Sequence, residues 1–233
     1  MTVPLIGEHD GLAYALFLDD EPVVKGVLIL HGAGSAKESH FDFARLAVAN
    51  GVAALAYDAR GHGRSNGAFG PAAIDDVHTM LTLLRREAGV NRVAVRGSSM
   101  GGFQAILGAA RDGDVDAVVA ICPAPPELLL QGVRSGRLEG FEADREALEA
   151  WLPTVDLREA AASLGPRTAL LLLHAQGDEQ VPYTVSEELY GVASRPKRLL
   201  ILPGGHHRSL QHDGEIQAES LRFIERAAAG RLA

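Results

Sequence analysis

The stretch that most constrains this chain lies between Val93 and Leu107. A short run rich in β-branched residues is followed at once by Gly-Ser-Ser-Met-Gly at 97–101, and then by residues typical of a helix. This G-x-S-x-G spacing between a strand and a helix predicts a sharp turn that exposes the Ser99 hydroxyl above the edge of a sheet. Glycine is expected at both ends of the motif because side chains there would collide in so tight a turn.

The alternative is a glycine-rich turn whose serine has no chemical role, because small residues are common where a strand meets a helix. A serine hydroxyl becomes a nucleophile only when a base removes its proton, and a carboxylate must hold that base in one tautomer. A functional Ser99 therefore requires an acid and a histidine on later loops at the same edge of the sheet.

Hydrophobic runs alternate with amphipathic segments along the chain. Strands are expected at the runs 12–18, 23–30, 52–57, 93–95, 116–121, 169–173 and 198–202. Helices are expected at 41–49, 71–88, 103–107, 184–192 and 214–228. We expect the first two strands to pair as an antiparallel edge. The alternation predicts an α/β fold, a mostly parallel twisted sheet with helices on both faces, whose ligands gather at the carboxyl ends of the strands.

Two later loops supply the acid and the base. Asp178 follows the strand expected at 169–173, and His206 and His207 follow the one expected at 198–202. Both loops leave carboxyl ends of parallel strands, so they should meet Ser99 at one edge. The positions favour nucleophilic chemistry over an idle serine, and either histidine could be the base.

The negative charge that forms during attack on a carbonyl requires backbone N–H donors. The Met100 N–H, directly after the nucleophile, is one expected donor, and the loop after the strand at 23–30 should supply the other. Within His-Gly-Ala-Gly at 31–34, the Ala33 N–H is the first choice and Gly34 the second. Loss of one such donor typically costs about 2.7–4 kcal/mol of transition-state stabilisation.

Residues 127–164 interrupt the alternation with leucines and a tryptophan among charged residues. We predict a single domain over 1–233 with a small helical cap insertion at 127–164. Apolar residues that could line an acyl pocket over Ser99 are Leu128, Leu129, Phe141, Trp151 and Leu152, with Gly34 at the oxyanion loop. Each of the apolar residues could instead serve only to anchor the cap helices.

Composition narrows the partners. A net charge of −8 without a basic run argues against nucleic acid, and no apolar run reaches the roughly 18 residues that span a bilayer. The N-terminus lacks the basic start and apolar core of a signal peptide. No histidine shows metal-ligand spacing such as H-E-x-x-H. We therefore expect a cytoplasmic monomer or homodimer that takes a small-molecule substrate and uses neither metal nor cofactor.

The charged loop at 58–65 could be mistaken for a site. We expect it to be structural, with an aspartate and an arginine paired as a buttress, and we expect His31 to tie down its own loop by hydrogen bonds.

These motifs together resemble the α/β-hydrolase superfamily, near small bacterial serine esterases similar to dienelactone-hydrolase-like and serine-aminopeptidase-like hydrolases. The matching stretches are HGAG at 31–34, DARGHGRS at 58–65, GSSMGG at 97–102, HAQGDEQVP at 174–182 and PGGHHR at 203–208. The resemblance implies the α/β-hydrolase fold, with Ser99 as nucleophile, Asp178 as acid and His207 as base. It favours His207 over His206 because the family pattern places an arginine or aromatic directly after the base, and Arg208 stands there.

The activity that follows is hydrolysis of carboxylic esters of short to medium acyl chains through an acyl-enzyme. A peptidase or a thioesterase would use the same three residues, and a small-molecule receptor with little turnover could use the same fold. An epoxide hydrolase or a dehalogenase is disfavoured, because those mechanisms need an aspartate where this chain has Ser99.

Overall fold

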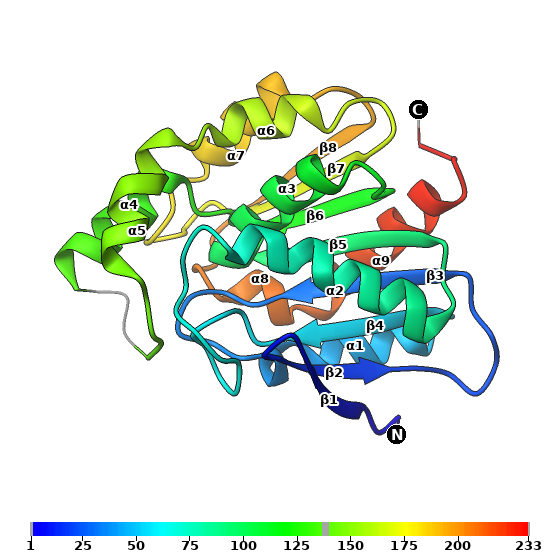
Figure 1. The fold of residues 1–233 in the computed structure, drawn as a ribbon. Coiled ribbons are helices and arrows are strands. Elements are labelled where there is room, and N and C mark those ends of the chain that lie inside the picture. Colours follow the sequence, from blue (N-terminus) through cyan, green and yellow to red (C-terminus); the bar gives the residue numbers. More distant parts are fainter. Residues whose placement is uncertain (1, 137–139, 233) are drawn as a thin grey trace.

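A computed structural model describes residues 2–136 and 140–232, and an eight-stranded sheet forms its centre (Figure 1). The strands are β1 (Leu5–His9), β2 (Leu12–Phe17), β3 (Lys25–Leu30), β4 (Val52–Tyr57), β5 (Arg92–Ser98), β6 (Ala117–Ile121), β7 (Ala169–Ala175) and β8 (Lys197–Leu202). Their order across the sheet is β1-β2-β4-β3-β5-β6-β7-β8. Strands β3 to β8 run parallel, and β2 pairs antiparallel with β1 and β4. The predicted mostly parallel sheet is confirmed.

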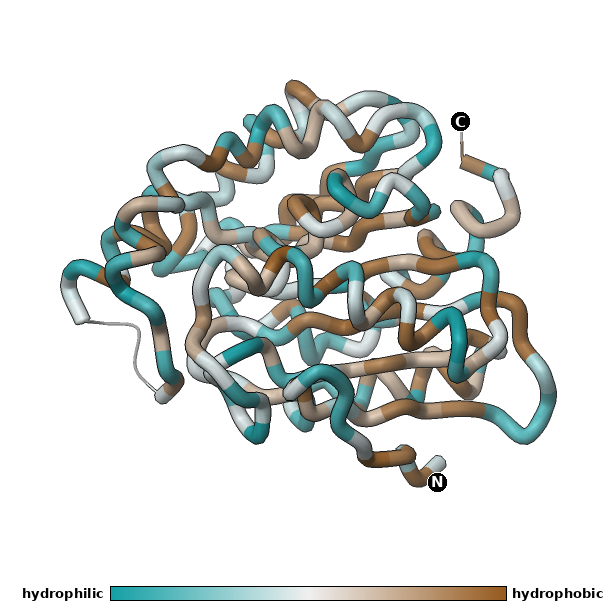
Figure 2. The backbone as a smooth tube through the Cα atoms, viewed as in Figure 1, coloured by the Kyte–Doolittle hydropathy of each residue, from teal (hydrophilic) through white to brown (hydrophobic). Residues whose placement is uncertain are grey.

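Helices cover both faces of the sheet (Figure 1). One face carries α2 (Ala73–Ala88), α3 (Met100–Asp112), α6 (Leu157–Ser163) and α7 (Thr184–Val192), and the other carries α1 (Phe41–Val48) and α9 (Gly214–Ala228). Successive residues of a strand point to opposite faces, so Leu28 joins one hydrophobic core and Ile29 the other. Figure 2 shows the hydrophobic residues gathered along the central strands. Double coverage explains why β4 is buried at every position.

The antiparallel edge differs from the prediction. Strand β2 does not pair with β3; it forms a hairpin with β1, a strand that the sequence analysis did not assign, and its other neighbour is β4. The hairpin turns through Asp10 and Gly11, whose φ angles of 51° and 77° match the positive values that a two-residue hairpin turn favours. Strand β3 therefore lies inside the sheet, next to β5.

The segment between β6 and β7 consists of helices at one end of the sheet. It contains α4 (Pro126–Ser135), α5 (Arg145–Trp151), a 3₁₀ turn η2 (Leu152–Thr154) and α6. Helix α4 packs with α5 and η2, whereas α6 packs on α3 and α7 and so belongs to the main helical layer. Figure 1 shows α4 and α5 projecting beyond the carboxyl ends of the strands. Residues 137–139 of the predicted cap lie outside the described residues.

The remaining elements are a 3₁₀ turn η1 (Lys37–His40) before α1 and a short helix α8 (Ser209–His212) before α9. Across residues 2–136 and 140–232, none of the helices combines the length and the apolar character needed to cross a membrane.

Candidate active site

Ser99 sits alone between β5 and α3, in a backbone conformation that non-glycine residues rarely adopt. Its φ is 54° and its ψ is −117°. Such conformations cost of order 1–3 kcal/mol and persist only where the surrounding structure enforces them. Here the Ser99 N–H donates to the Ile121 carbonyl at 2.8 Å, and the Ser99 carbonyl accepts from the Phe103 N–H at 3.0 Å. The turn is therefore fixed to β6 on one side and to the first turn of α3 on the other.

The two glycines of the motif are required by close backbone approaches. A Cβ on Gly97 would lie 2.0 Å from the Gly101 carbonyl oxygen, and a Cβ on Gly101 would lie 2.4 Å from the Leu30 carbonyl oxygen. Both distances are far inside van der Waals contact, so the predicted collision is confirmed. Close packing of the turn against the end of β3 also brings Gly32 to Ser99: a Cβ on Gly32 would be 3.5 Å from the Ser99 Cβ.

His207 and Asp178 form a direct pair. The His207 Nδ1 lies 2.7 Å from Asp178 Oδ2, and the Asp178 side chain is fully buried. The other carboxylate oxygen, Oδ1, accepts the N–H groups of Gln180 and Val181, each at 2.9 Å. Because Nδ1 is bound to the acid, Nε2 is the nitrogen of His207 that remains to accept a proton. His207 lines the same cavity as Ser99.

Burial alone would raise the pKa of Asp178. Hydrogen bonds from His174, His207 and the backbone N–H groups of Val181 and Gln180 outweigh burial and hold the pKa of this carboxyl well below its usual range. The acid therefore stays ionised throughout the neutral pH range, which favours the tautomer of His207 with its proton on Nδ1.

The neighbouring His206 takes a different role. It is exposed, and its backbone N–H and carbonyl both bond to the Ser209 hydroxyl, at 3.0 and 2.7 Å. Its Nδ1 accepts the Arg208 N–H at 3.3 Å. The structure thus places His207 against the acid and leaves His206 as a brace of the loop.

The cavity beside Ser99 has a volume of about 740 Å³. The 35–39 loop, β5 and α8 contribute polar lining, and α4 and the loop after Asp178 contribute most of the apolar lining. The polar group includes Ser35, Ser39, Ser98, Gln211 and His212, and the apolar group is Ala33, Ala124, Leu128, Leu129 and Val181. Gln131 of α4 and Glu179 and Gln180 of the loop after Asp178 add polar groups beside these apolar residues. The cavity is large enough for a small organic molecule.

Comparisons with known proteins agree with this fold. A family model described as serine aminopeptidase, S33, matches residues 21–129. The uncharacterized protein YfhR of Escherichia coli K12 is 25% identical over 202 residues, which cover 84% of this chain and 68% of YfhR. The structure of Est1E from Butyrivibrio proteoclasticus with ferulic acid is 20% identical, with a TM-score of 0.73 over 97% of this chain and 98% of that chain. A monoacylglycerol lipase from Paleococcus ferrophilus is 20% identical, with a TM-score of 0.70 over 94% of this chain and 98% of the lipase chain.

The chain has the α/β-hydrolase fold. The mostly parallel sheet, the strained serine after β5, and the aspartate and histidine after β7 and β8 are the features that the sequence motifs predicted for this fold.

The loop after β3 borders Ser99. Ala33 lines the cavity, whereas Gly34 does not. Gly34 is exposed and has a φ of 66°. It lies within a turn in which the Ser35 N–H donates to the Gly32 carbonyl at 3.2 Å. Of the two candidate donors on this loop, Ala33 is the one at the cavity. The Met100 N–H opens α3, and the first N–H groups of a helix have no acceptor within the helix.

The cap residues divide between two places. Leu128 and Leu129 line the cavity as predicted. The other three apolar candidates do not, which corrects the expectation. The Trp151 ring packs edge-on against the Phe103 ring of α3, with 5.9 Å between the ring centroids. Trp151 also lines a separate groove between α2, α3 and α6. Phe141 stacks on His62 at 3.9 Å, and Leu152 is buried in the core.

The charged loop at 58–65 is structural, but its ion pairs differ from the prediction. Arg64 reaches Asp58 only through its backbone N–H, at 2.9 Å, and no aspartate and arginine side chains within residues 58–65 form an ion pair with each other. Asp58 instead pairs with the buried Lys37 at 2.7 Å, and Arg60 pairs with Asp76 of α2 at 2.6 Å. The partners lie 21 and 16 residues away in the sequence. His31 ties its loop as expected: its Nε2 accepts the Ala59 N–H at 2.9 Å, and its Nδ1 lies 2.7 Å from the Gly32 carbonyl.

Sequence reasoning missed His174, whose ring contacts the Asp178 carboxylate. His174 is fully buried in β7, with Nδ1 2.7 Å from the Ser186 hydroxyl and Nε2 3.0 Å from the Val181 carbonyl and 3.4 Å from Asp178 Oδ2. A proton on Nε2 would satisfy all three contacts. The spacing His-x-x-x-Asp within HAQGD was the available signal.

Among the described residues, one trio could in principle hold a metal ion: Cys122, His174 and Asp178, whose ligand atoms lie within 4.8 Å of one another. A metal would require the Cys122 thiolate, but burial raises the pKa of that thiol. Both His174 nitrogens and both Asp178 oxygens already have protein partners. The donor set fits hydrogen-bonded support of the acid better than it fits metal coordination.

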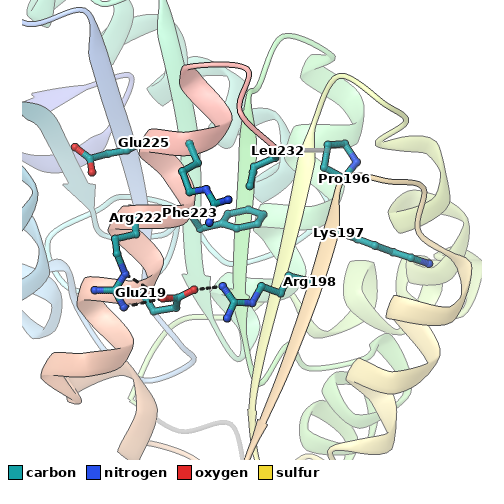
Figure 3. A pocket seen from close by; sticks show the side chains of 9 residues that line it. Pro196, Lys197, Arg198, Glu219, Arg222, Phe223, Glu225 and Leu232 are labelled. Carbon is teal, nitrogen blue, oxygen red and sulfur yellow. Dashed lines mark hydrogen bonds and ion pairs between the residues drawn. The ribbon is translucent and has the colours of Figure 1, made fainter.

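A second cavity of about 340 Å³ lies between β8 and α9 (Figure 3). Lys197 and Arg198 open β8, so this cavity is at the amino ends of the strands, away from Ser99. Its charges are largely paired: Glu219 bonds both Arg198 and Arg222. Charged residues on an exposed edge strand also oppose edge-to-edge pairing.

Proposed function

We propose that this protein is a serine hydrolase that cleaves carboxylic esters through an acyl-enzyme, with Ser99 as nucleophile, His207 as base and Asp178 as acid. The observation that carries the proposal is the 2.7 Å contact between His207 Nδ1 and a fully buried Asp178, in a cavity that His207 shares with a strained Ser99. A histidine oriented by a carboxylate can take the proton of a serine hydroxyl.

In the first half-reaction, Ser99 Oγ attacks the ester carbonyl carbon while its proton passes to His207 Nε2. The carbonyl oxygen becomes an oxyanion, which the N–H groups of Met100 and Ala33 stabilise. The tetrahedral intermediate collapses: the bond from carbon to the alcohol oxygen breaks, and His207 gives its proton to the departing alcohol. Asp178 stays ionised and stabilises the imidazolium throughout.

In the second half-reaction, water takes the place of the alcohol. His207 Nε2 removes a proton from the water as its oxygen attacks the acyl carbon. Collapse of the second intermediate releases the carboxylic acid and returns the proton to Ser99. The reaction uses only side chains, backbone N–H groups and water.

The fold neighbours support ester chemistry: one is named a lipase, and Est1E holds ferulic acid. The size of the cavity and its apolar residues on α4 favour short to medium acyl chains. A peptidase is the second candidate, because the matching family model is described as a serine aminopeptidase.

The test is turnover of p-nitrophenyl butyrate and of an amino-acid p-nitroanilide by wild type and by Ser99→Ala. Loss of the nucleophile should reduce ester turnover by roughly 10⁴- to 10⁶-fold. Ser163→Ala, which removes an exposed hydroxyl on α6, should be unchanged. Retention of a tenth of the activity by Ser99→Ala would refute the assignment, and faster cleavage of the anilide would favour the peptidase.

A further inference from the structure

Helix α8 begins two residues after His207 and is attached to the nucleophile strand at one residue, Gln211. The Gln211 side-chain oxygen accepts the Ser98 hydroxyl at 2.8 Å. The Gln211 backbone carbonyl accepts the Arg96 Nη2 at 3.2 Å. Ser98 and Arg96 are both buried on β5, and Ser98 precedes the nucleophile directly. We call these two hydrogen bonds the Gln211 clasp.

We propose that Gln211 is a positioning residue whose clasp sets the distance between His207 and Ser99; the inference rests on the proposed function. The reason lies in how His207 is otherwise held. The His207 ring is hydrogen-bonded to Asp178, and the His207 backbone N–H donates to Glu179 Oε2 at 3.2 Å. Both contacts tie the base to the loop after β7. The clasp ties the segment that carries the base to β5.

Apart from the clasp, the segment is anchored by the Gly177 N–H, which donates to the Gly204 carbonyl at 2.9 Å, and by a contact of His212 with Asp42. Residues 203–206 and Arg208 are exposed, and Gly204 and Gly205 have φ angles of 69° and 74°, which leaves this stretch intrinsically permissive. Within α8, Leu210 is the buried apolar anchor. A single leucine limits the depth of the helix in the core but does not fix its rotation. The two hydrogen bonds between Gln211 and β5, together with the contact between His212 and Asp42, fix that rotation.

Neighbouring groups hold the side-chain amide and the backbone carbonyl of Gln211 in place. The Gln211 amide nitrogen lies 2.8 Å from His212 Nε2, and His212 Nδ1 lies 3.2 Å from Asp42 Oδ2. This contact directs the amide oxygen toward Ser98. Gln217 bonds both Asp42, at 2.6 Å, and the Gln211 carbonyl, at 3.1 Å.

Arg96 gives the clasp a strong energetic basis. It is completely buried, its guanidinium lies over the Phe43 ring at 4.0 Å, and its Nε and Nη1 have no protein partner among the described residues. A buried cation is costly without hydrogen bonds, so its bond to the Gln211 carbonyl is strongly favoured.

The experiment compares Gln211→Leu, Gln211→Glu and Ser98→Ala with wild type and with Gln176→Leu, which alters an exposed glutamine outside the cavity. The readouts are kcat and KM for p-nitrophenyl butyrate, the rate of covalent labelling by a small fluorophosphonate, and the melting temperature. Labelling requires the base to be aligned with Ser99 but requires little substrate binding.

Gln211→Leu and Ser98→Ala should each lower kcat and the labelling rate by about 10- to 100-fold, the effect of a displacement near 1 Å, with KM little changed. Gln211→Glu keeps an acceptor for the Ser98 hydroxyl and should recover most of the rate. The double variant Ser98→Ala/Gln211→Leu should be no slower than either single variant, because both remove one interaction.

The proposal would be overturned if Gln211→Leu is labelled at the wild-type rate. It would also be overturned if the variant has a lower melting temperature but the wild-type kcat at temperatures where it is folded. Either result would leave the esterase assignment standing. Absence of Ser99-dependent labelling in wild type would instead overturn the proposed function itself.

Discussion

At the scale of the residue, the strained conformation of Ser99 depends on two positions that cannot carry a side chain. The approaches of 2.0 Å and 2.4 Å at Gly97 and Gly101 are to backbone carbonyls, which cannot rotate away as a flexible side chain could. Either the turn opens or the end of β3 shifts when a methyl group is added. Both changes would displace Ser99 from its neighbours.

We therefore expect Gly97→Ala to lower the free energy of unfolding by about 1–3 kcal/mol or more, and to abolish ester hydrolysis. Gly191→Ala is the matched control: its added Cβ meets nothing within 4 Å, and it lies within α7, where alanine gains up to about 1 kcal/mol over glycine. Urea unfolding of both variants measures the difference. Equal unfolding midpoints for Gly97→Ala and wild type would contradict this account of the turn.

His174 gives a second prediction at this scale. His174→Ala removes a donor to Asp178 and leaves the Ser186 hydroxyl and the Val181 carbonyl without their partner. We expect kcat to fall by about 10- to 100-fold, as when the groups that orient an active-site residue are lost. Ser186→Ala touches only the far side of the imidazole and should have a smaller effect. Comparable kcat values for His174→Ala and wild type would exclude His174 from the support of the acid.

At the scale of the element, the leucine side chains of α4 and the tryptophan of α5 lie in different parts of the molecule. Leu128 lines the cavity, whereas Trp151 packs on α3. The prediction is that Leu128→Ala enlarges the acyl side of the cavity and raises the ratio of kcat/KM for hexanoyl over acetyl esters. Burial of one methylene is worth about 0.8 kcal/mol, so a shift of about fourfold per accommodated carbon is expected.

Trp151→Ala serves as the control for acyl preference. It should destabilise the protein through lost packing on Phe103 but leave the hexanoyl to acetyl ratio unchanged. A ratio is independent of the fraction of folded enzyme, so instability does not obscure the comparison. If Trp151→Ala changes the ratio as much as Leu128→Ala does, our placement of the acyl side is wrong.

The same elements show what a sequence can predict. Helices α7 and α9 have the predicted bounds, because each carries a clear amphipathic period between stop signals. Strand β1 was missed although Asp10-Gly11 is a strong hairpin signal. The direction of Trp151 could not be predicted, because it depends on how α5 is rotated against α3. Helix α8 has four residues, which is too short for a hydrophobic period to be recognised in the sequence. The contacts of Gln211 could therefore not be predicted either.

At the scale of the whole molecule, local order along the chain was easier to predict than long-range pairing. Ser99, Asp178 and the pair His206–His207 were identifiable because each follows a strand whose end lies at one edge of the sheet, and the choice of His207 came from the family resemblance. The partners of Asp58 and Arg60 were not, because Lys37 and Asp76 come from elements that only the finished fold brings near. The exchange of β3 and β4 in the sheet order likewise depends on contacts that no local pattern records.

Three buried histidines link the stability of the molecule to pH. Burial lowers the pKa of His31 and His40, and burial together with the proximity of His31 lowers the pKa of His62 to about 4. Histidines in the unfolded chain have a pKa near 6.5, so below that pH the unfolded chain binds more protons than the folded chain does. The free energy of unfolding therefore falls as the pH decreases from about 6.5 toward 4. Each such histidine contributes up to about 1.4 kcal/mol per pH unit in this window.

Urea unfolding between pH 7.5 and pH 5 would measure this loss. His62→Phe keeps an aromatic ring against Phe141 and removes one titrating group, so its stability should fall less steeply than that of wild type. Identical slopes for the two proteins would show that His62 does not take up a proton on unfolding.

The arrangement of β5, β7 and β8 also has a consequence for the life of the chain on the ribosome. The nucleophile belongs to the interior of the sheet, next to β3 and β6, whereas the acid and the base follow the two strands added last at one edge. The elbow at Ser99 can form while residues beyond 175 are still unsynthesised, yet the hydroxyl then lacks a proton acceptor. If Ser99 acts as proposed, a nascent chain would therefore be inactive. Ester hydrolysis would begin only after β8 has joined the sheet, so the appearance of activity would mark the completion of the sheet.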